Sequence, residues 1–176
     1  MQKHLASLGI LILRLVLGSL MVGHGAQKLF GWFGGGGLAG AEAMVRSLGL
    51  RPAWFWAIVA GVAEFGGGLL FALGLLNPIG SLGITASMLM AITKVHWPKV
   101  WVSQGGFEYP LVNVAATTAV ALTGPGKYSL DRALGIRLPL PASYLIGLAA
   151  VLAGYATALV VAARPAAPAE APPRAA

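Results

Sequence analysis

Ionisable residues interrupt the long apolar stretches of this chain. Four stretches are long enough to cross a bilayer, and the first three contain Arg14 with His24, then Glu64, then Lys94. A charged side chain in hydrocarbon costs roughly 2.5–3.5 kcal/mol on insertion scales. Each of these groups must therefore face protein or water and find a partner. We expect the function to lie where these side chains converge.

The composition identifies an integral membrane protein. Hydrophobic residues make up 57% of the chain and charged residues 10%, whereas charged residues approach about 25% in soluble domains. Lysine and arginine occur singly at the ends of the apolar stretches and form no stripe that could follow phosphates, which excludes nucleic acid as a partner. The chain contains no cysteine, so a redox role requires a bound carrier or a partner protein.

The apolar pattern predicts an all-α fold, a polytopic membrane helix bundle. The first stretch continues past Arg14 without a cleavage site, which indicates an uncleaved transmembrane helix and not a signal peptide. About 20 apolar residues are needed for each crossing. The predicted helices cover residues 6–30, 53–76, 78–96, 108–123 and 142–163.

An up-down path through these helices places the segments 31–52 and 97–107 on the same side of the membrane. We expect both to be long loops, and the glycine run 34–37 to be flexible because it lacks the Lys-Ser/Thr of a phosphate-binding loop. The five tryptophans all fall on this side: Trp32, Trp54, Trp56, Trp97 and Trp101. This side is therefore the expected functional side.

Depth along the helices predicts an ion pair between Arg14 and Glu64. Arg14 lies about eight residues into the first helix and Glu64 about eleven into the antiparallel second helix, so at 1.5 Å per residue both fall at nearly the same level. Small residues flank Glu64 at helical spacing and allow close approach of a neighbouring helix. We expect a polar pocket that is lined by Arg14, Glu64, His24, Lys28, Lys94 and His96.

These groups also have purely structural interpretations. A buried ion pair often fixes helix register without doing chemistry, and His24 could make an interhelical hydrogen bond. Lys28 and Lys94 could be membrane anchors that extend toward the interface. No metal site is expected, because the three histidines have no cysteine and no second histidine at ligand spacing.

Five short motifs occur in order along the chain. They are residues 24–35 (HGAQKLFGWFGG), 60–68 (AGVAEFGGG), 95–98 (VHWP), 105–111 (GGFEYPL) and 124–131 (GPGKYSLD). Together they resemble the DoxX-like family of small bacterial integral membrane proteins (DoxX/DoxD-type) over residues 8–135. The resemblance implies a multi-pass protein of the bacterial inner membrane with a four-helix core, domain 1–139. Residues 140–164 would then form a fifth, additional C-terminal transmembrane helix, and the Pro/Ala-rich tail 165–176 is expected to be disordered.

The same resemblance implies a redox role. The namesakes of the family are associated with a membrane thiosulfate:quinone oxidoreductase, and other members with membrane complexes that handle oxidative and thiol stress beside soluble redox enzymes. The polar positions of this chain that match the family motifs are His24, Gln27, Lys28, Glu64, His96 and Glu108.

The first functional hypothesis is a quinone-linked oxidoreductase subunit in the lipid bilayer with a soluble redox enzyme as partner. The quinone ring would pack on Phe30 and Trp32. His24 or His96 would donate to a carbonyl oxygen, and Glu64 with Arg14 would manage the proton. The catalytic candidates are thus His24, Glu64 and Arg14, and the predicted quinone-binding residues are His24, Gln27, Lys28, Phe30, Trp32, Lys94, His96 and Glu108.

Two alternatives belong to other functional classes. One is a non-enzymatic membrane scaffold, whose aromatic loops dock a soluble partner while the buried charges hold the bundle together. The other is a small-solute transporter, since intramembrane ionisable groups also mark substrate paths. A homo-oligomer in the bilayer is compatible with all three hypotheses.

Overall fold

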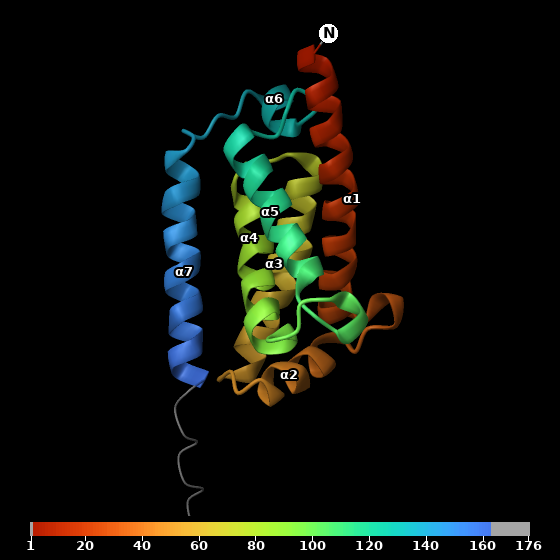
Figure 1. The fold of residues 1–176 in the computed structure, drawn as a ribbon, viewed down its shortest axis with the longest axis vertical. Helices are drawn as coiled ribbons and strands as arrows, with labels where there is room; N and C mark the ends of the chain where they lie inside the picture. Colours follow the sequence, from red (N-terminus) through yellow and green to blue (C-terminus); the bar gives the residue numbers. More distant parts are fainter. Residues whose placement is uncertain (1, 163–176) are drawn as a thin grey trace, which may run out of the picture.

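The structure, a computed structural model, describes residues 2–162, which are helical and contain no strand. Five helices run along the long axis in Figure 1: α1 (Gln2–Phe30), α3 (Ala53–Leu73), α4 (Ile79–Met90), α5 (Glu108–Thr123) and α7 (Ala142–Ala162). α2 (Gly37–Ser47) and α6 (Leu130–Leu134) lie at opposite ends, and short helical turns occur at η1 (Trp32–Gly34), η2 (Ala91–His96) and η3 (Val102–Gln104). The predicted all-α bundle is confirmed, and the predicted disordered tail lies outside the described residues.

Four segments are long and apolar enough to cross a membrane. They are His4–Phe30, Ala53–Leu73, Ile79–His96 and Ala142–Val160. α5 has 16 residues and would extend only about 24 Å at 1.5 Å per residue, so it is shorter than a usual transmembrane helix. It nevertheless runs beside α4 through the bundle (Figure 1). The chain is a polytopic membrane bundle.

Glycines let α1 and α4 approach α3 closely. A Cβ atom added at Gly25 would lie 2.3 Å from the backbone nitrogen of Phe65, and one added at Gly68 would lie 2.8 Å from that of Val22. On the other side of α3, a Cβ at Gly80 would lie 2.6 Å from the backbone nitrogen of Phe71. Gly68 is one of the small residues near Glu64 that were predicted to allow close helix packing, whereas the contacts of Gly25 and Gly80 were not predicted.

Apolar side chains fill the half of the bundle nearer to α6. One buried cluster joins four helices: Leu17 and Met21 of α1, Phe71 of α3, Ile84 and Met88 of α4, and Val120 of α5. The C-terminal end of α3 lies in this half, where Gly74 closes the helix with a φ of 62°. Glycine adopts this left-handed conformation without steric cost. This ends α3 at Leu73, slightly before the predicted end at residue 76.

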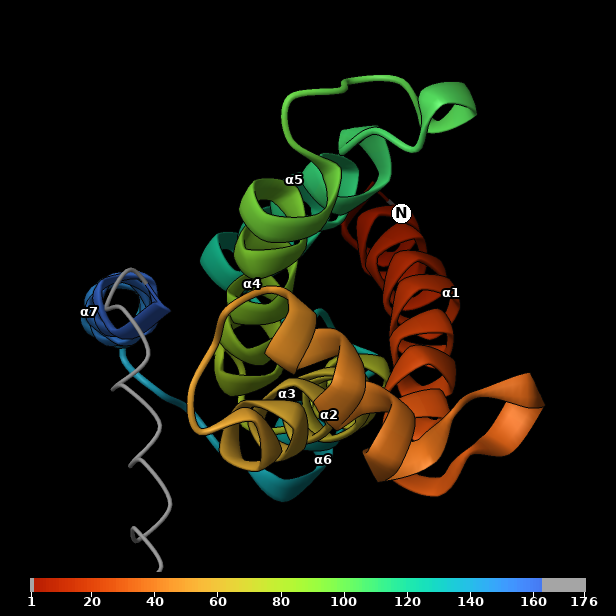
Figure 2. The ribbon, with the colours of Figure 1, turned by 90° about the horizontal axis from the view of Figure 1, so that it is seen from below.

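The prediction of a loop over residues 31–52 is wrong in part, because the segment contains α2. Leu38, Ala41, Val45 and Leu48 recur every three or four residues, which is the pattern of a helix with one apolar face. Ala41 and Val45 are buried in a cluster with the start of α3. α2 lies across the end of the bundle, as Figure 2 shows from below. This end is thus covered by an ordered helix.

α7 packs on the outer side of α4. Figure 2 shows it beside α4 and away from α1. Gly147 lies against Leu82, where an added Cβ would be 2.2 Å from a side-chain methyl carbon. The Tyr144 hydroxyl is 3.0 Å from that of Thr118 on α5. These contacts fix one half of α7, while side chains such as Ile146, which is 72% exposed, face the bilayer.

Candidate functional site

A cavity of about 400 Å³ lies between the helices at the end of the bundle covered by α2. Its lining is largely apolar and includes Met44 and Leu48. The lining side chains that can form hydrogen bonds or carry charge are His24, Lys28, Trp56, Glu64, Ser87, His96, Tyr109 and Tyr155. Cavities of this size and character, with a few polar groups in an apolar wall, are typical of small-molecule sites.

The charged centre of the cavity is an ion pair between Lys28 of α1 and Glu64 of α3. Glu64 accepts from the Lys28 ammonium through one carboxylate oxygen and from the Ser87 hydroxyl at 2.6 Å through the other. Its side chain is 5% exposed, against 22% for Lys28. A buried carboxylate is therefore paired at both oxygens, while the ammonium keeps contact with the cavity.

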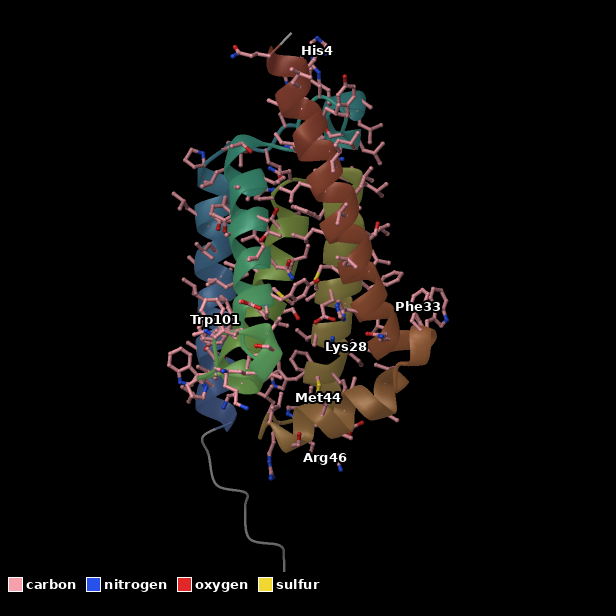
Figure 3. All side chains as sticks on the ribbon, turned by 45° about the vertical axis from the view of Figure 1, so that its right-hand side comes forward. His4, Lys28, Phe33, Met44, Arg46 and Trp101 are labelled. Atoms are coloured by element: carbon pink, nitrogen blue, oxygen red, sulfur yellow. The ribbon has the colours of Figure 1, made fainter. Side chains whose placement is uncertain are left out.

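Helix geometry explains why these two side chains meet. Side chains on a helix lean toward its N-terminus. Because α1 and α3 run in opposite directions, Lys28 leans back along α1 as Glu64 leans toward it from α3. In Figure 3 the Lys28 side chain reaches into the bundle, whereas Arg46 at the same end points away from it.

The predicted ion pair between Arg14 and Glu64 is wrong. Arg14 is 1% exposed, and its guanidinium donates to backbone carbonyl oxygens. The acceptors are those of Phe71 at 3.1 Å, Ala72 at 2.9 Å and Tyr128 at 3.1 Å, together with that of Pro125. Arg14 thus ties α1 to the end of α3 and to the segment after α5, and it does not line the cavity.

The error arises from the relative position of the two helices. α1 has 29 residues and α3 has 21, and the N-terminal part of α1 extends past α3 (Figure 1). Gly18 packs against Ala72, which places Arg14 beside the C-terminal end of α3. Glu64 lies eight residues before Ala72, or about 12 Å along the axis at 1.5 Å per residue. Counting inward from the helix starts therefore placed Arg14 too deep.

Asp131 is a second buried charge in this region, and its role was not predicted from the sequence. Its carboxylate accepts from the backbone N–H groups of Leu76 at 2.7 Å and Asn77 at 2.9 Å, in the turn between α3 and α4. Through Asp131, the 124–131 motif binds the turn between α3 and α4 and so has a structural role. One signal was available in the sequence. A helix that ends inside a membrane protein leaves backbone N–H and C=O groups without partners, and charged residues elsewhere in the chain can provide those partners.

The two histidines of the cavity have different environments. The ring of His24 lies 6.4 Å from that of Tyr109 between centroids, and it makes no hydrogen bond within the described residues. The Nδ1 atom of His96 lies 2.7 Å from the carbonyl oxygen of Gly105, which can only accept, so Nδ1 carries a proton. Neutral His96 then presents Nε2 as an acceptor. His24 is thus the better placed of the two to donate to a ligand.

Five of the predicted quinone-binding residues lie outside the cavity lining: Gln27, Phe30, Trp32, Lys94 and Glu108. Phe30 and Trp32 are 52% and 55% exposed and contact each other with centroids 5.1 Å apart. A ligand in the cavity would not reach them, contrary to the expected ring packing. The Glu108 carboxylate accepts from the backbone N–H of Val102 at 2.7 Å, which indicates a structural role.

The end of α4 explains why His96 faces the cavity and Lys94 does not. Residues Ala91–His96 form a π-helical turn, closed by a hydrogen bond of 2.8 Å from the N–H of Trp97 to the carbonyl of Ile92. Residues two apart on a helix point in different directions, as the spacing predicted. π-Helical turns inside longer helices often occur at functional sites.

Comparison with known proteins identifies the family. The DoxX family model matches residues 9–97, half of the chain. Inner membrane protein YqjF of Escherichia coli K12 is 29% identical over 134 residues, which cover 76% of this chain and 97% of that protein. No solved structure matches the chain. All the charged groups of the cavity lie within the matched segment, whereas α7 lies beyond it. The chain is a multi-pass protein of the bacterial inner membrane, and it belongs to the DoxX family.

Proposed function

We propose that this protein is an integral membrane subunit of a redox complex and that it binds a quinone in the cavity. The observation that carries the proposal is the combination of an apolar cavity inside the bundle with His24, which has no hydrogen-bond partner among the described residues, and the Lys28–Glu64 pair. A quinone needs an apolar slot for its ring and hydrogen-bond donors for its two carbonyl oxygens.

The polar groups of the cavity could deliver the protons that quinone reduction requires. Conversion of a quinone to a quinol takes up two electrons and two protons, and the electrons would come from a soluble redox enzyme that docks at the membrane surface. Negative charge then develops on the ring oxygens. His24 and the Lys28 ammonium would each donate a hydrogen bond to one ring oxygen and deliver one of the two protons, and both would take a proton back from water at the membrane surface. Glu64, which accepts from Ser87, would stabilise the ammonium form of Lys28.

The apolar cluster on the α6 side favours a binding site over a transport path. Leu17, Met21, Phe71, Ile84 and Val120 pack together between the cavity and the other end of the bundle. A polar solute would have to cross this cluster. The scaffold alternative has support of its own, because Phe33, Trp97 and Trp101 at the α2 end are 74%, 65% and 60% exposed, and such aromatic side chains suit either a partner or the lipid interface.

Purification followed by extraction tests the proposal. The protein is isolated in mild detergent from bacterial membranes, and bound quinone is measured by mass spectrometry for the wild type, His24→Ala and His4→Ala. We expect the wild type and His4→Ala to retain quinone and His24→Ala to lose it, because His4 lies on the same helix at the opposite end (Figure 3). Absence of quinone from the wild type, or equal retention by both variants, would favour the scaffold.

A further inference from the structure

The fifth long helix forms part of the cavity wall. Val151, Gly154 and Tyr155 of α7 line the same cavity as His24 and Lys28 of α1. α7 and α1 lie on opposite sides of the pair formed by α3 and α4 (Figure 2). The cavity reaches both helices, and its lining includes residues of α3 and α4, which lie between them.

The backbones of α3 and α4 touch on the α6 side of Glu64 and as far as Ala63. A Cβ added at Gly67 would lie 3.2 Å from the carbonyl oxygen of Gly80, and one added at Gly83 would lie 3.1 Å from that of Ala63. The Ser87–Glu64 hydrogen bond of 2.6 Å crosses between the helices. The cavity is lined on both helices by small side chains, those of Ala60, Ala63, Ala86 and Ala91. Along the seam between α3 and α4, the wall of the cavity is therefore made largely of methyl groups.

The lining of the cavity is polar on some helices and apolar on others. The ion pair and both histidines come from α1, α3 and the end of α4, and His24 is exposed. Val59 of α3, Met90 of α4 and the three α7 residues offer apolar surface apart from the Tyr155 hydroxyl. A volume of about 400 Å³ is near the lower limit of ligand pockets, roughly 300 Å³. A ring with a long apolar chain would fill it and extend beyond it.

We infer that α7 forms the binding site for the apolar tail of the ligand. The head of the ligand lies beside His24 and Lys28, and its tail passes through the seam between α3 and α4 and lies along α7 at Gly154. This inference rests on the proposed function, since it concerns the same ligand. It assigns a role to α7, which lies outside the segment that the family model matches.

Gly154 offers a direct way to test the tail site. A Cβ atom added at Gly154 meets no other atom within 4 Å, so the first atom of a larger side chain is accommodated there. Such a side chain would occupy the space assigned to the tail. Leu152 lies two residues away and is 48% exposed, which makes Leu152→Trp a matched control of equal bulk that faces lipid.

The experiment compares two probes that share one ring. Affinities for a decyl-substituted benzoquinone and for the same ring without the decyl chain are measured by fluorescence quenching with the full chain in lipid nanodiscs. We expect Gly154→Trp to weaken binding of the decyl compound by about tenfold or more, because each buried methylene that is lost contributes about 0.8 kcal/mol. Affinity for the tailless ring should be unchanged, and Leu152→Trp should alter neither.

The other outcomes separate the two proposals. Equal weakening of both probes by Gly154→Trp, or no weakening of either, would overturn the tail site while leaving the quinone site in place. The same conclusion follows if the wild type binds both probes equally well. Failure of the wild type to bind either probe would overturn the proposed function and the tail site with it.

Discussion

Substituting Lys28 and substituting Glu64 should destabilise the protein by different amounts, although both changes break the same ion pair. Lys28→Met removes the ammonium and leaves a carboxylate that is 5% exposed with Ser87 as its remaining partner. An unpaired buried charge of this kind costs about 3–5 kcal/mol of unfolding free energy. Glu64→Gln keeps an acceptor for Ser87 and leaves an ammonium that is 22% exposed to the cavity. We expect this change to cost less, about 1.5–3 kcal/mol, the value of a hydrogen bond to a charged group.

A double-mutant cycle measures whether the two side chains act together. The variant with Lys28→Met and Glu64→Gln has no unpaired charge, so its loss should be smaller than the sum of the single losses by about 1–3 kcal/mol. The free energy of unfolding is measured for the wild type, both single variants and the double variant by denaturation in mixed micelles.

Arg14 supplies the matched control cycle. Its guanidinium bonds to backbone carbonyls near the α6 end, about 12 Å along the axis from Glu64 by helix geometry. Losses from Arg14→Met and Glu64→Gln should therefore add to within about 0.5 kcal/mol. Coupling between Arg14 and Glu64 together with additivity between Lys28 and Glu64 would refute the pairing described here.

Two further predictions concern packing and topology. Gly25→Ala should strongly lower the unfolding temperature, because its Cβ would lie 2.3 Å from a backbone nitrogen of α3. Gly23→Ala should be tolerated, because no atom lies within 4 Å of the added Cβ. Equal unfolding temperatures for the two variants would contradict this packing. Cysteines introduced by Trp101→Cys and Lys127→Cys, in a chain that has none of its own, should react with an impermeant reagent from opposite membrane sides, and labelling of both from one side would exclude the topology.

The long helices could be predicted because their signals are local. Apolar length and turn residues located the five long helices to within a few residues, including the break at Asn77-Pro78. α2 was missed because the glycine run 34–37 suggested a flexible loop, although the apolar residues that follow recur at helical spacing. In α2, burial of one face against α3 stabilises the helix and overrides the local glycine signal.

The site was only partly predictable, because pairing depends on how far one helix is shifted along another. The sequence predicted a common pocket for His24, Lys28, Glu64 and His96, and all four line one cavity in the structure. The partner of Glu64 could not be found by counting from helix starts. That shift is set by contacts such as Gly25 with Phe65, which connect residues 40 positions apart.

The hydrogen bonds from Arg14 to carbonyl groups late in the chain have a consequence for biosynthesis. α1 leaves the ribosome first, yet the acceptors of Arg14 include carbonyls at residues 125 and 128, and Asp131 completes the turn after α3. Until those residues are made, α1 carries a cation into the translocon without its final partners, at a cost of several kcal/mol. The core therefore closes late in synthesis, and the segment 9–97 that the family model matches lacks the later residues that pair with Arg14.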